Sequence, residues 1–249
     1  GKVFYFNQVG VQWLPDPDVT DTLVRNVDLS DNHTGWTYVE SSTEDVETYD
    51  ASGSLIRLDN RAAGGFELTY ASGKPATIRD SFGQEIAVAY GANGLVSTVT
   101  GAAIGTVQYR YDTNQNLNEV EWSNGAIRRY HYENATFKNS LTGITDELGV
   151  RYATFGYDAS GSAVLTYLSG NVNRWSIALV SGKLRVTDPR NVTTDLTFQN
   201  VLGVAKVAAA TQPCATCGGV GASSANTFDA NGNLTSKKDF NNKKSCYAY

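Results

Sequence analysis

The sequence predicts an all-β protein built as a spiralling antiparallel sheet of short hairpin repeats. Three observations support this. An aromatic residue followed by a polar turn recurs along the chain, and short segments alternate between apolar and polar residues. The composition, with 24 glycines, 14 tyrosines and 18% charged residues in 249, is typical of turn-rich extended structure. A helical bundle is therefore disfavoured.

The repeat is marked by tyrosines at nearly constant spacing. The separations between the five strictest anchors are 21, 20, 21 and 21 residues. Those anchors are Tyr49, Tyr70, Tyr90, Tyr111 and Tyr132, and the series continues less strictly through Tyr157, Leu179, Phe198, Phe228 and Tyr249. A period this short leaves no room for a crossover helix and indicates strands joined by tight turns.

Three of these anchors are followed by a turn with aspartate first and glycine fourth. The aspartate can accept hydrogen bonds from backbone amides two or three residues on, and the glycine can adopt the positive φ that ends a type I turn. The best copies are Asp50 with Gly53, Asp158 with Gly161 and Asp229 with Gly232; further turn residues are Gly73, Gly94, Asp112, Asp146 with Gly149, Asp80 with Gly83, Asp188 with Asn191 and Asp239 with Asn242.

Between the turns, apolar and polar residues alternate with the period of a strand. Phe66, Leu68 and Tyr70 alternate with Glu67 and Thr69, which predicts a sheet with one buried face. We expect roughly twenty strands of about five residues each. Because strand twist accumulates, so wide a sheet must curl, spiral or close.

The repeat spacing divides the chain into four segments. Residues 1–48 form a lead-in, residues 49–200 hold the repeats, residues 201–226 form a Gly/Ala-rich insertion, and residues 227–249 hold a further repeat. The insertion is expected because Phe198 and Phe228 are 30 residues apart. Since the sequence starts at Gly1 and has no methionine, we expect an excerpt of a longer array.

Charge and hydropathy disfavour two classes of partner. The chain has 20 basic and 25 acidic residues and a pI near 5.1, so no basic footprint for a nucleic acid is present. No stretch approaches 18 consecutive apolar residues, so we expect no insertion into a membrane.

Several motifs together resemble the RHS repeat, also called the YD repeat. They are the Tyr-Asp-x-x-Gly-x-Leu copies, Gly35-Trp36-Thr37-Tyr38, the segment 13–18 and the block 141–152. The family includes bacterial polymorphic toxins, insecticidal toxin complex subunits and teneurins. The resemblance implies that the sheet forms part of a hollow shell, and in bacterial members such a shell encloses a C-terminal toxin domain.

The resemblance also implies a function and partners. The chain would be a structural segment of a shell that encloses, protects and delivers a toxin or effector domain lying outside it. Its partners would be flanking repeats of the same larger polypeptide, the enclosed domain and a secretion-system component. The protein would be secreted or displayed at the bacterial cell surface. An extracellular adhesin that binds a carbohydrate or receptor is the alternative, and a filament of stacked copies is a third reading.

One motif of the family departs from its expected form. Members that release their cargo carry an aspartyl protease segment with an Asp-Pro-x-Gly-Leu core, but Asn191 stands where that glycine is expected after Asp188-Pro189. We therefore interpret Asp188 as an ordinary turn residue and assign no cleavage site.

The cysteines leave four alternatives open. Cys214 and Cys217 form a Cys-x-x-Cys in a Gly/Ala/Ser-rich loop. A disulfide that staples this loop is favoured over free thiols, over a metal site that also needs Cys246, and over redox catalysis, which needs a helix N-terminus to lower a thiol pKa.

Carboxylates and histidines give no catalytic pattern. The acidic clusters Glu44-Asp45-Glu47, Asp146-Glu147 and Glu119-Glu121 are interpreted as a polar link before a strand, a turn and the polar face of a strand. His33 and His131 have no candidate nucleophile nearby in sequence and are expected to be structural. We therefore predict no enzyme, no catalytic residue, no cofactor and no metal.

Overall fold

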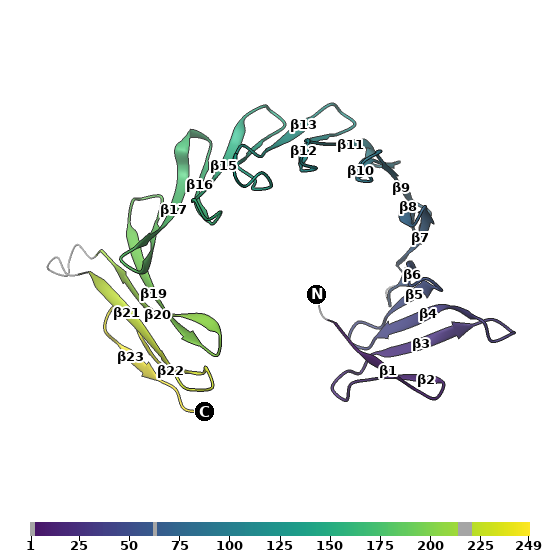
Figure 1. Cartoon of the computed structure of the whole chain (residues 1–249), viewed down its shortest axis with the longest axis horizontal. Helices are drawn as coiled ribbons and strands as arrows, with labels where there is room; N and C mark the ends of the chain where they lie inside the picture. Colours follow the sequence, from purple (N-terminus) through teal and green to yellow (C-terminus); the bar gives the residue numbers. More distant parts are fainter. Residues whose placement is uncertain (1–2, 62–63, 214–220) are drawn as a thin grey trace. The chain divides into compact units, whose positions relative to one another are not determined.

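The computed structural model describes residues 3–61, 64–213 and 221–249. Within these ranges it contains 23 strands and one 3-10 turn, Ser169–Asn171 (Figure 1). The described strand pairs are antiparallel and join strands that follow one another in the sequence. The prediction of an all-β antiparallel meander is confirmed.

The chain divides into two compact units, of which the first comprises Gly1–Arg110 and Val120–Ala126. The division falls within β11 and β12, so these two strands contribute to both units. The strands of the first unit are β1 (Phe6–Val9), β2 (Gln12–Pro15), β3 (Thr22–Val27), β4 (His33–Glu40), β5 (Asp45–Asp50), β6 (Leu55–Asp59), β7 (Gly65–Ala71), β8 (Lys74–Asp80), β9 (Glu85–Tyr90), β10 (Val96–Gly101), most of β11 (Gly105–Tyr111) and the end of β12 (Leu117–Glu121).

The second unit comprises Tyr111–Glu119 and Ile127–Tyr249. Besides the start of β12, its strands are β13 (Ile127–His131), β14 (Gly143–Thr145), β15 (Arg151–Tyr157), β16 (Ala163–Leu168), β17 (Val172–Val180), β18 (Lys183–Thr187), β19 (Thr193–Val201), β20 (Val204–Gln212), β21 (Ala222–Phe228), β22 (Leu234–Lys238) and β23 (Lys244–Cys246).

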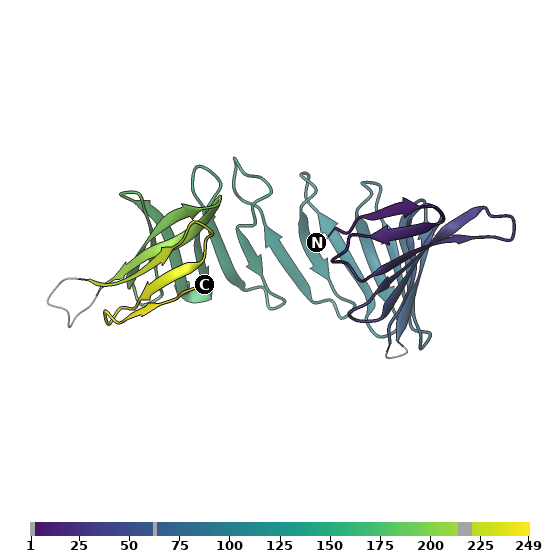
Figure 2. The same ribbon diagram turned by 90° about the horizontal axis from the view of Figure 1, so that it is seen from below.

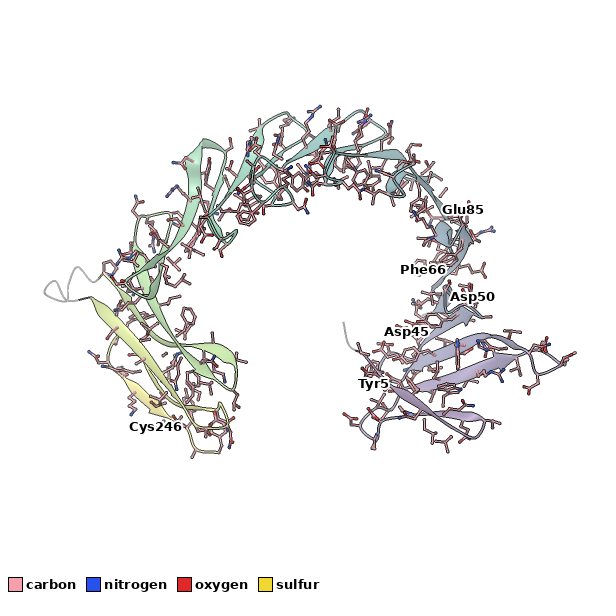
Figure 3. The ribbon with its side chains drawn as sticks, in the orientation of Figure 1. Tyr5, Asp45, Asp50, Phe66, Glu85 and Cys246 are labelled. Carbon is pink, nitrogen blue, oxygen red and sulfur yellow. The ribbon has the colours of Figure 1, made fainter. Side chains whose placement is uncertain are left out.

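Strand register gives the sheet one apolar and one polar face. In the first unit, Leu58 is opposite Phe66 and Ile78 is opposite Ile86. The neighbouring residues of the same strands form a charged series, in which Arg57 is opposite Glu67, Glu67 is opposite Arg79 and Arg79 is opposite Glu85. Phe66 and Glu85 accordingly lie on opposite sides of the ribbon (Figure 3). Opposite charges in directly opposed positions stabilise neighbouring strands.

The apolar face is less buried than the sequence pattern predicts. The strands of each unit form a single layer (Figure 2), and no described element packs over either face. Phe66 is 47% exposed, and the buried apolar residues among those described are Val107, Val120, Ala153, Val201 and Ala210. The stability of each unit therefore depends more on contacts between adjacent strands than on a hydrophobic core.

One local expectation differs from the structure. The proposed polar link is partly a strand, because Asp45 and Glu47 belong to β5, where Glu47 is opposite Tyr38. Within the predicted insertion, residues 201–226, the structure describes β20, which has nine residues and pairs with β19 on one side and with β21 on the other.

Candidate functional site

The recurring structural site is a five-residue turn that begins with aspartate. In the turn at Asp50, the amide of Asp50 donates to the Ser54 carbonyl (2.9 Å) and the Gly53 amide donates to the Asp50 carbonyl (3.0 Å). The carboxylate Oδ1 of Asp50 accepts from the amides of Ser52 and Ser54, each at 2.9 Å. The second amide is thus four residues on, one further than the sequence pattern suggests.

The same hydrogen bonds recur throughout the described residues. Nine turns share them, beginning at Asp28, Asp50, Asp80, Asp112, Asp146, Asp158, Asp188, Asp229 and Asp239. The fourth residue has positive φ in each, whether it is a glycine such as Gly161 (84°) or a residue such as Asn191 (61°). Asparagine tolerates this conformation better than most residues.

One of these turns, at Asp28, is not among those predicted from the sequence. Asp28 lies in the segment predicted to be a lead-in, yet its carboxylate accepts from the amides of Ser30 (2.8 Å) and Asn32 (2.9 Å). Asparagine four residues after aspartate is the signal that could have revealed it. The same pair occurs in the turns at Asp112 and Asp229, where the asparagine side chain also donates to the carboxylate.

Hydrogen bonding holds several turn carboxylates in their charged form. The Ser52 hydroxyl lowers the pKa of Asp50, and the Ser160 hydroxyl does the same to the pKa of Asp158. The Asn233 amide lowers the pKa of Asp229. Burial opposes the shift at Asp112, but hydrogen bonds from Asn116 and Asn114 leave its pKa lowered. These carboxylates act as anchors for backbone amides.

Two predicted turn glycines lie in turns without aspartate. Gly73 follows Ser72 in the connection between β7 and β8, and the positive φ values of both (75° and 52°) correspond to the type I′ turn of a hairpin. Gly94 ends a turn that begins with Gly91. There the Leu95 amide donates to the Asn93 side chain (3.1 Å), because no carboxylate is present at position 91.

Three repeat tyrosines bind the backbone of the preceding repeat. The hydroxyl of Tyr70 donates to the Leu55 carbonyl at 2.8 Å, and that of Tyr90 donates to the Pro75 carbonyl at 3.0 Å. The hydroxyl of Tyr157 donates to the Leu141 carbonyl at 2.8 Å. The acceptor is 15 or 16 residues earlier in each case. The sequence spacing identified these tyrosines but not their acceptors.

The remaining anchors differ in their contacts. The Tyr49 hydroxyl donates to Glu47, and burial together with this carboxylate raises the pKa of Tyr49 to about 12. Burial, with the charge of Asp112, raises the pKa of Tyr132. Tyr111 is half-buried, and Phe228 has no hydroxyl to donate.

Two lysines contact an anchor and its turn at the same time. Lys74 lies 4.9 Å from the ring centroid of Tyr90, and its amine donates to the Gly94 carbonyl. Lys206 lies 5.1 Å from the ring centroid of Phe228 and donates to the Gly232 carbonyl. A cation over an aromatic face gains electrostatic attraction in addition to the hydrogen bond. Sequence reasoning missed both lysines.

The connection between β13 and β14 is fastened to the turns on both sides of it. Arg151 makes a bidentate ion pair with Glu133, with both nitrogen–oxygen distances 2.8 Å, and this pair lowers the pKa of Glu133 to about 2. Asn116 donates to the Lys138 carbonyl at 2.9 Å. A Cβ placed on Gly161 would lie 2.9 Å from the Phe137 ring, so this glycine allows the connection to pack closely.

The acidic clusters form structural contacts. Glu119 pairs with Arg129 (2.9 Å) and Glu121 with Arg110 (2.7 Å), both across strands. Glu147 pairs with Arg128 at 2.8 Å, and Glu44 pairs with Arg61 at 3.0 Å.

The histidines likewise make local contacts. His131 Nε2 hydrogen-bonds the Thr145 hydroxyl at 2.7 Å, and the His33 ring lies 5.0 Å from Trp36.

The cysteine prediction falls mostly outside the described residues. Cys214 and Cys217 lie in the segment that the structure does not describe, and Cys246 in β23 is exposed with a free thiol. Among the described residues, no three side chains of the His, Cys, Asp and Glu types are grouped as metal ligands would be. The same ranges contain no helix long and apolar enough to span a membrane.

Comparisons with known proteins give similarities of fold at low identity. No family model matches the chain, and no curated protein matches it. The structure of the Photorhabdus luminescens Tc holotoxin pore is 12% identical, with 88% of this chain and 12% of that chain covered and a TM-score of 0.35. A TcdB2–TccC3 crystal structure is 11% identical, with 90% and 17% covered and a TM-score of 0.34.

A porin-like protein from Bacteroides uniformis is 11% identical over 88% of both chains, with a TM-score of 0.20. The chain therefore spans only a small part, 12% and 17%, of the two toxin structures. With TM-scores no higher than 0.35, these similarities do not bear on function.

Proposed function

We propose that the chain is a structural segment of an RHS/YD-repeat shell, which encloses, protects and delivers a toxin or effector domain lying outside it. The observation that carries this proposal is the bond from each of three repeat tyrosines to a carbonyl 15 or 16 residues earlier. A repeat fastened in this way to the one before it suits a continuous wall, because stability in a repeat array comes from contacts between neighbours.

Two further features support a structural role. The aspartate turns repeat one set of hydrogen bonds across strands, as a wall built from equivalent units requires. The acidic clusters that invited an acid–base interpretation are engaged in ion pairs such as Glu121 with Arg110. The proposal includes no catalytic residue and no cofactor.

The proposal names partners and a location. Flanking repeats of a larger polypeptide would complete the wall, the enclosed toxin or effector domain would lie inside it, and a secretion-system component would export the assembly. The protein would then be secreted or displayed at a bacterial cell surface.

Cryo-electron microscopy of the natural polypeptide that carries this chain tests the proposal. We expect the sheet to close around a separate, protease-resistant segment. Limited proteolysis should release that segment only after the wall is opened by denaturant. An open array with no enclosed polypeptide, or a segment cleaved at the same rate with and without denaturant, would overturn the proposal.

The adhesin alternative has an observation of its own. Trp175 in β17 and Phe198 in β19 are 42% and 47% exposed, and the strand register puts them on the same face. Exposed aromatic rings can stack on sugar rings. A glycan array probed with the wild-type chain and with Trp175→Ala separates the two functions: binding lost in the variant would favour the adhesin, and no binding favours the wall.

A further inference from the structure

The hairpin formed by β22 and β23 concentrates positive charge. Lys237 and Lys238 end β22, Lys243 precedes β23 and Lys244 begins it. Asp239 is the acidic residue between them, and its Oδ1 already accepts from the amides of Asn241 and Lys243, each at 2.9 Å. Residues 237–244 thus have a formal charge of +3 in a chain whose net charge is −5.

The four lysines lack compensating charge in the described part of the chain. None of its ion pairs involves them. Register places Lys238 directly opposite Lys244, and like charges in directly opposed positions destabilise a strand pair. Lys237, Lys243 and Lys244 are exposed. An anionic partner would relieve this repulsion.

The other end of the sequence has the complementary charge. The first 50 residues contain ten carboxylate side chains and two basic ones, a formal charge of −8. Asp16 and Asp18, in the connection between β2 and β3, are exposed, and no ion pair of the described residues involves them. The acidic strands belong to the first unit and the lysine hairpin to the second.

We propose that the β22–β23 hairpin of one copy docks onto the acidic N-terminal strands, β1–β5, of a second copy. The contact joins two different surfaces, so it is heterologous and can continue from copy to copy. A nucleic acid or an anionic membrane is a poorer partner, because the acidic strands and the net charge of −5 repel it. Exposed ion pairs are individually weak and are screened by salt, so the association should be weak and salt-sensitive.

Sedimentation velocity of the full 249-residue chain tests this contact. At about 10 mM ionic strength, where the Debye length is about 30 Å, the mean sedimentation coefficient should rise with protein concentration up to about 0.1 mM. At about 1 M, where the Debye length is about 3 Å, the chain should sediment as a monomer. The Lys243→Glu/Lys244→Glu variant should remain monomeric at both ionic strengths.

A matched control separates the hairpin from the net charge. The variant Lys138→Glu/Arg174→Glu changes the charge by the same amount at two exposed side chains outside the hairpin, and it should associate like the wild type. Circular dichroism checks that each variant keeps its strands. If the glutamates unfold the hairpin, the Lys243→Gln/Lys244→Gln variant should still weaken association severalfold.

Three results would overturn the proposal. The wild-type chain could stay monomeric at low ionic strength, or the Lys243→Glu/Lys244→Glu variant could associate as strongly as the wild type. Alternatively, a 20-base-pair DNA duplex or vesicles containing phosphatidylserine could bind the hairpin at low ionic strength and prevent association, which would assign the lysines to a polyanion.

Discussion

The repeats that contain Tyr90 and Phe228 make the same lysine contact although they differ in length. In the first, Lys74 binds the carbonyl of Gly94, 20 residues later; in the second, Lys206 binds the carbonyl of Gly232, 26 residues later. Five of the six additional residues belong to the connection between the two strands and one belongs to β21, and the contact is kept. This comparison shows that the geometry of adjacent strands, rather than residue count, fixes what the lysine contacts.

The two repeats also differ in what surrounds this contact. Tyr90 adds a hydroxyl bond to the Pro75 carbonyl, whereas Phe228 has no hydroxyl. The turn after Phe228 begins with Asp229, whereas the turn after Tyr90 begins with Gly91 and has no carboxylate at that position. Each repeat thus contains an interaction that the other lacks, namely the Tyr90 hydroxyl bond in the first and the Asp229 carboxylate in the second. Substitutions can test each interaction separately.

The largest effect is expected from the turn glycines. Gly94 and Gly232 have φ values of 77° and 82°, where a Cβ costs about 1 to 2 kcal/mol. The Cβ would also lie 2.8 Å and 3.2 Å from the lysine amines. Gly94→Ala and Gly232→Ala should therefore lower the free energy of unfolding by about 2 kcal/mol each, measured in urea.

Asparagine provides the control for this prediction. Asn191 and Asn242 occupy the same turn position at φ values of 61° and 64°. Gly94→Asn should therefore be milder than Gly94→Ala. Equal losses from the two substitutions would contradict the conformational explanation.

The next effect comes from the turn carboxylate. Asp229→Gly leaves the amides of Asn231 and Asn233 without their acceptor and should destabilise the Phe228 repeat by about 1 to 2 kcal/mol. The reverse substitution, Gly91→Asp, should stabilise the Tyr90 repeat, because a carboxylate at this position would accept from the amides of both Asn93 and Leu95, whereas the Asn93 side chain now accepts from that of Leu95. Hydrogen exchange of the two turns, followed by mass spectrometry, measures both changes. If Gly91→Asp accelerates exchange, the two turns are not equivalent.

The tyrosine bond ranks third. Tyr90→Phe removes the bond to the Pro75 carbonyl and should cost about 1 kcal/mol, measured by thermal unfolding. Tyr247→Phe is a suitable control because Tyr247 is 43% exposed. A loss at Tyr247 as large as that at Tyr90 would show that the hydroxyl bond contributes nothing specific.

Removing the lysine contact should lower the free energy of unfolding by a smaller amount, and by the same amount in the two repeats. Lys74→Met and Lys206→Met retain the aliphatic stem and remove the charge over the ring, so each should cost about 0.5 to 1 kcal/mol. Urea unfolding measures both. A clearly greater loss at one site would refute the equivalence of the two contacts.

The smallest expected difference between the two repeats is in their response to acid. Hydrogen bonding lowers the folded-state pKa of Asp229 below its ordinary value of 3.8. Its stabilisation is therefore present above pH 3.8 and is lost as the pH falls through the lower folded-state value. Hydrogen exchange in the Asp229 turn should accelerate over that range, relative to the turn at Gly91, after correction for intrinsic rates. Parallel pH profiles in the two turns would contradict this.

Much of the fold could be predicted because its determinants are local. Strand alternation around Phe66 and the turn chemistry of aspartate and glycine depend on residues a few positions apart, so periodicity reveals them. The nine-residue length of β20 has no signal in the sequence, because its run of small residues, Ala208, Ala209 and Ala210, gives no alternation. The polarity of Glu47 predicts a link, but pairing with Tyr38 places this residue in a strand.

The contacts between repeats could not be predicted in the same way. The carbonyl that accepts from Tyr70 belongs to Leu55, and a carbonyl carries no sequence signal, since every residue has one. Likewise, Lys74 and Lys206 reach their partners over different sequence separations, so no fixed spacing identifies the pair.

The alternation of short strands with aspartate turns is encoded locally, because φ preferences and side-chain-to-amide hydrogen bonds act within five residues. Which carbonyl each tyrosine binds, which ring each lysine covers and how exposed the apolar face remains follow only from the folded sheet. These depend on strand register and on the absence of a second described layer, and both are properties of strands packed side by side.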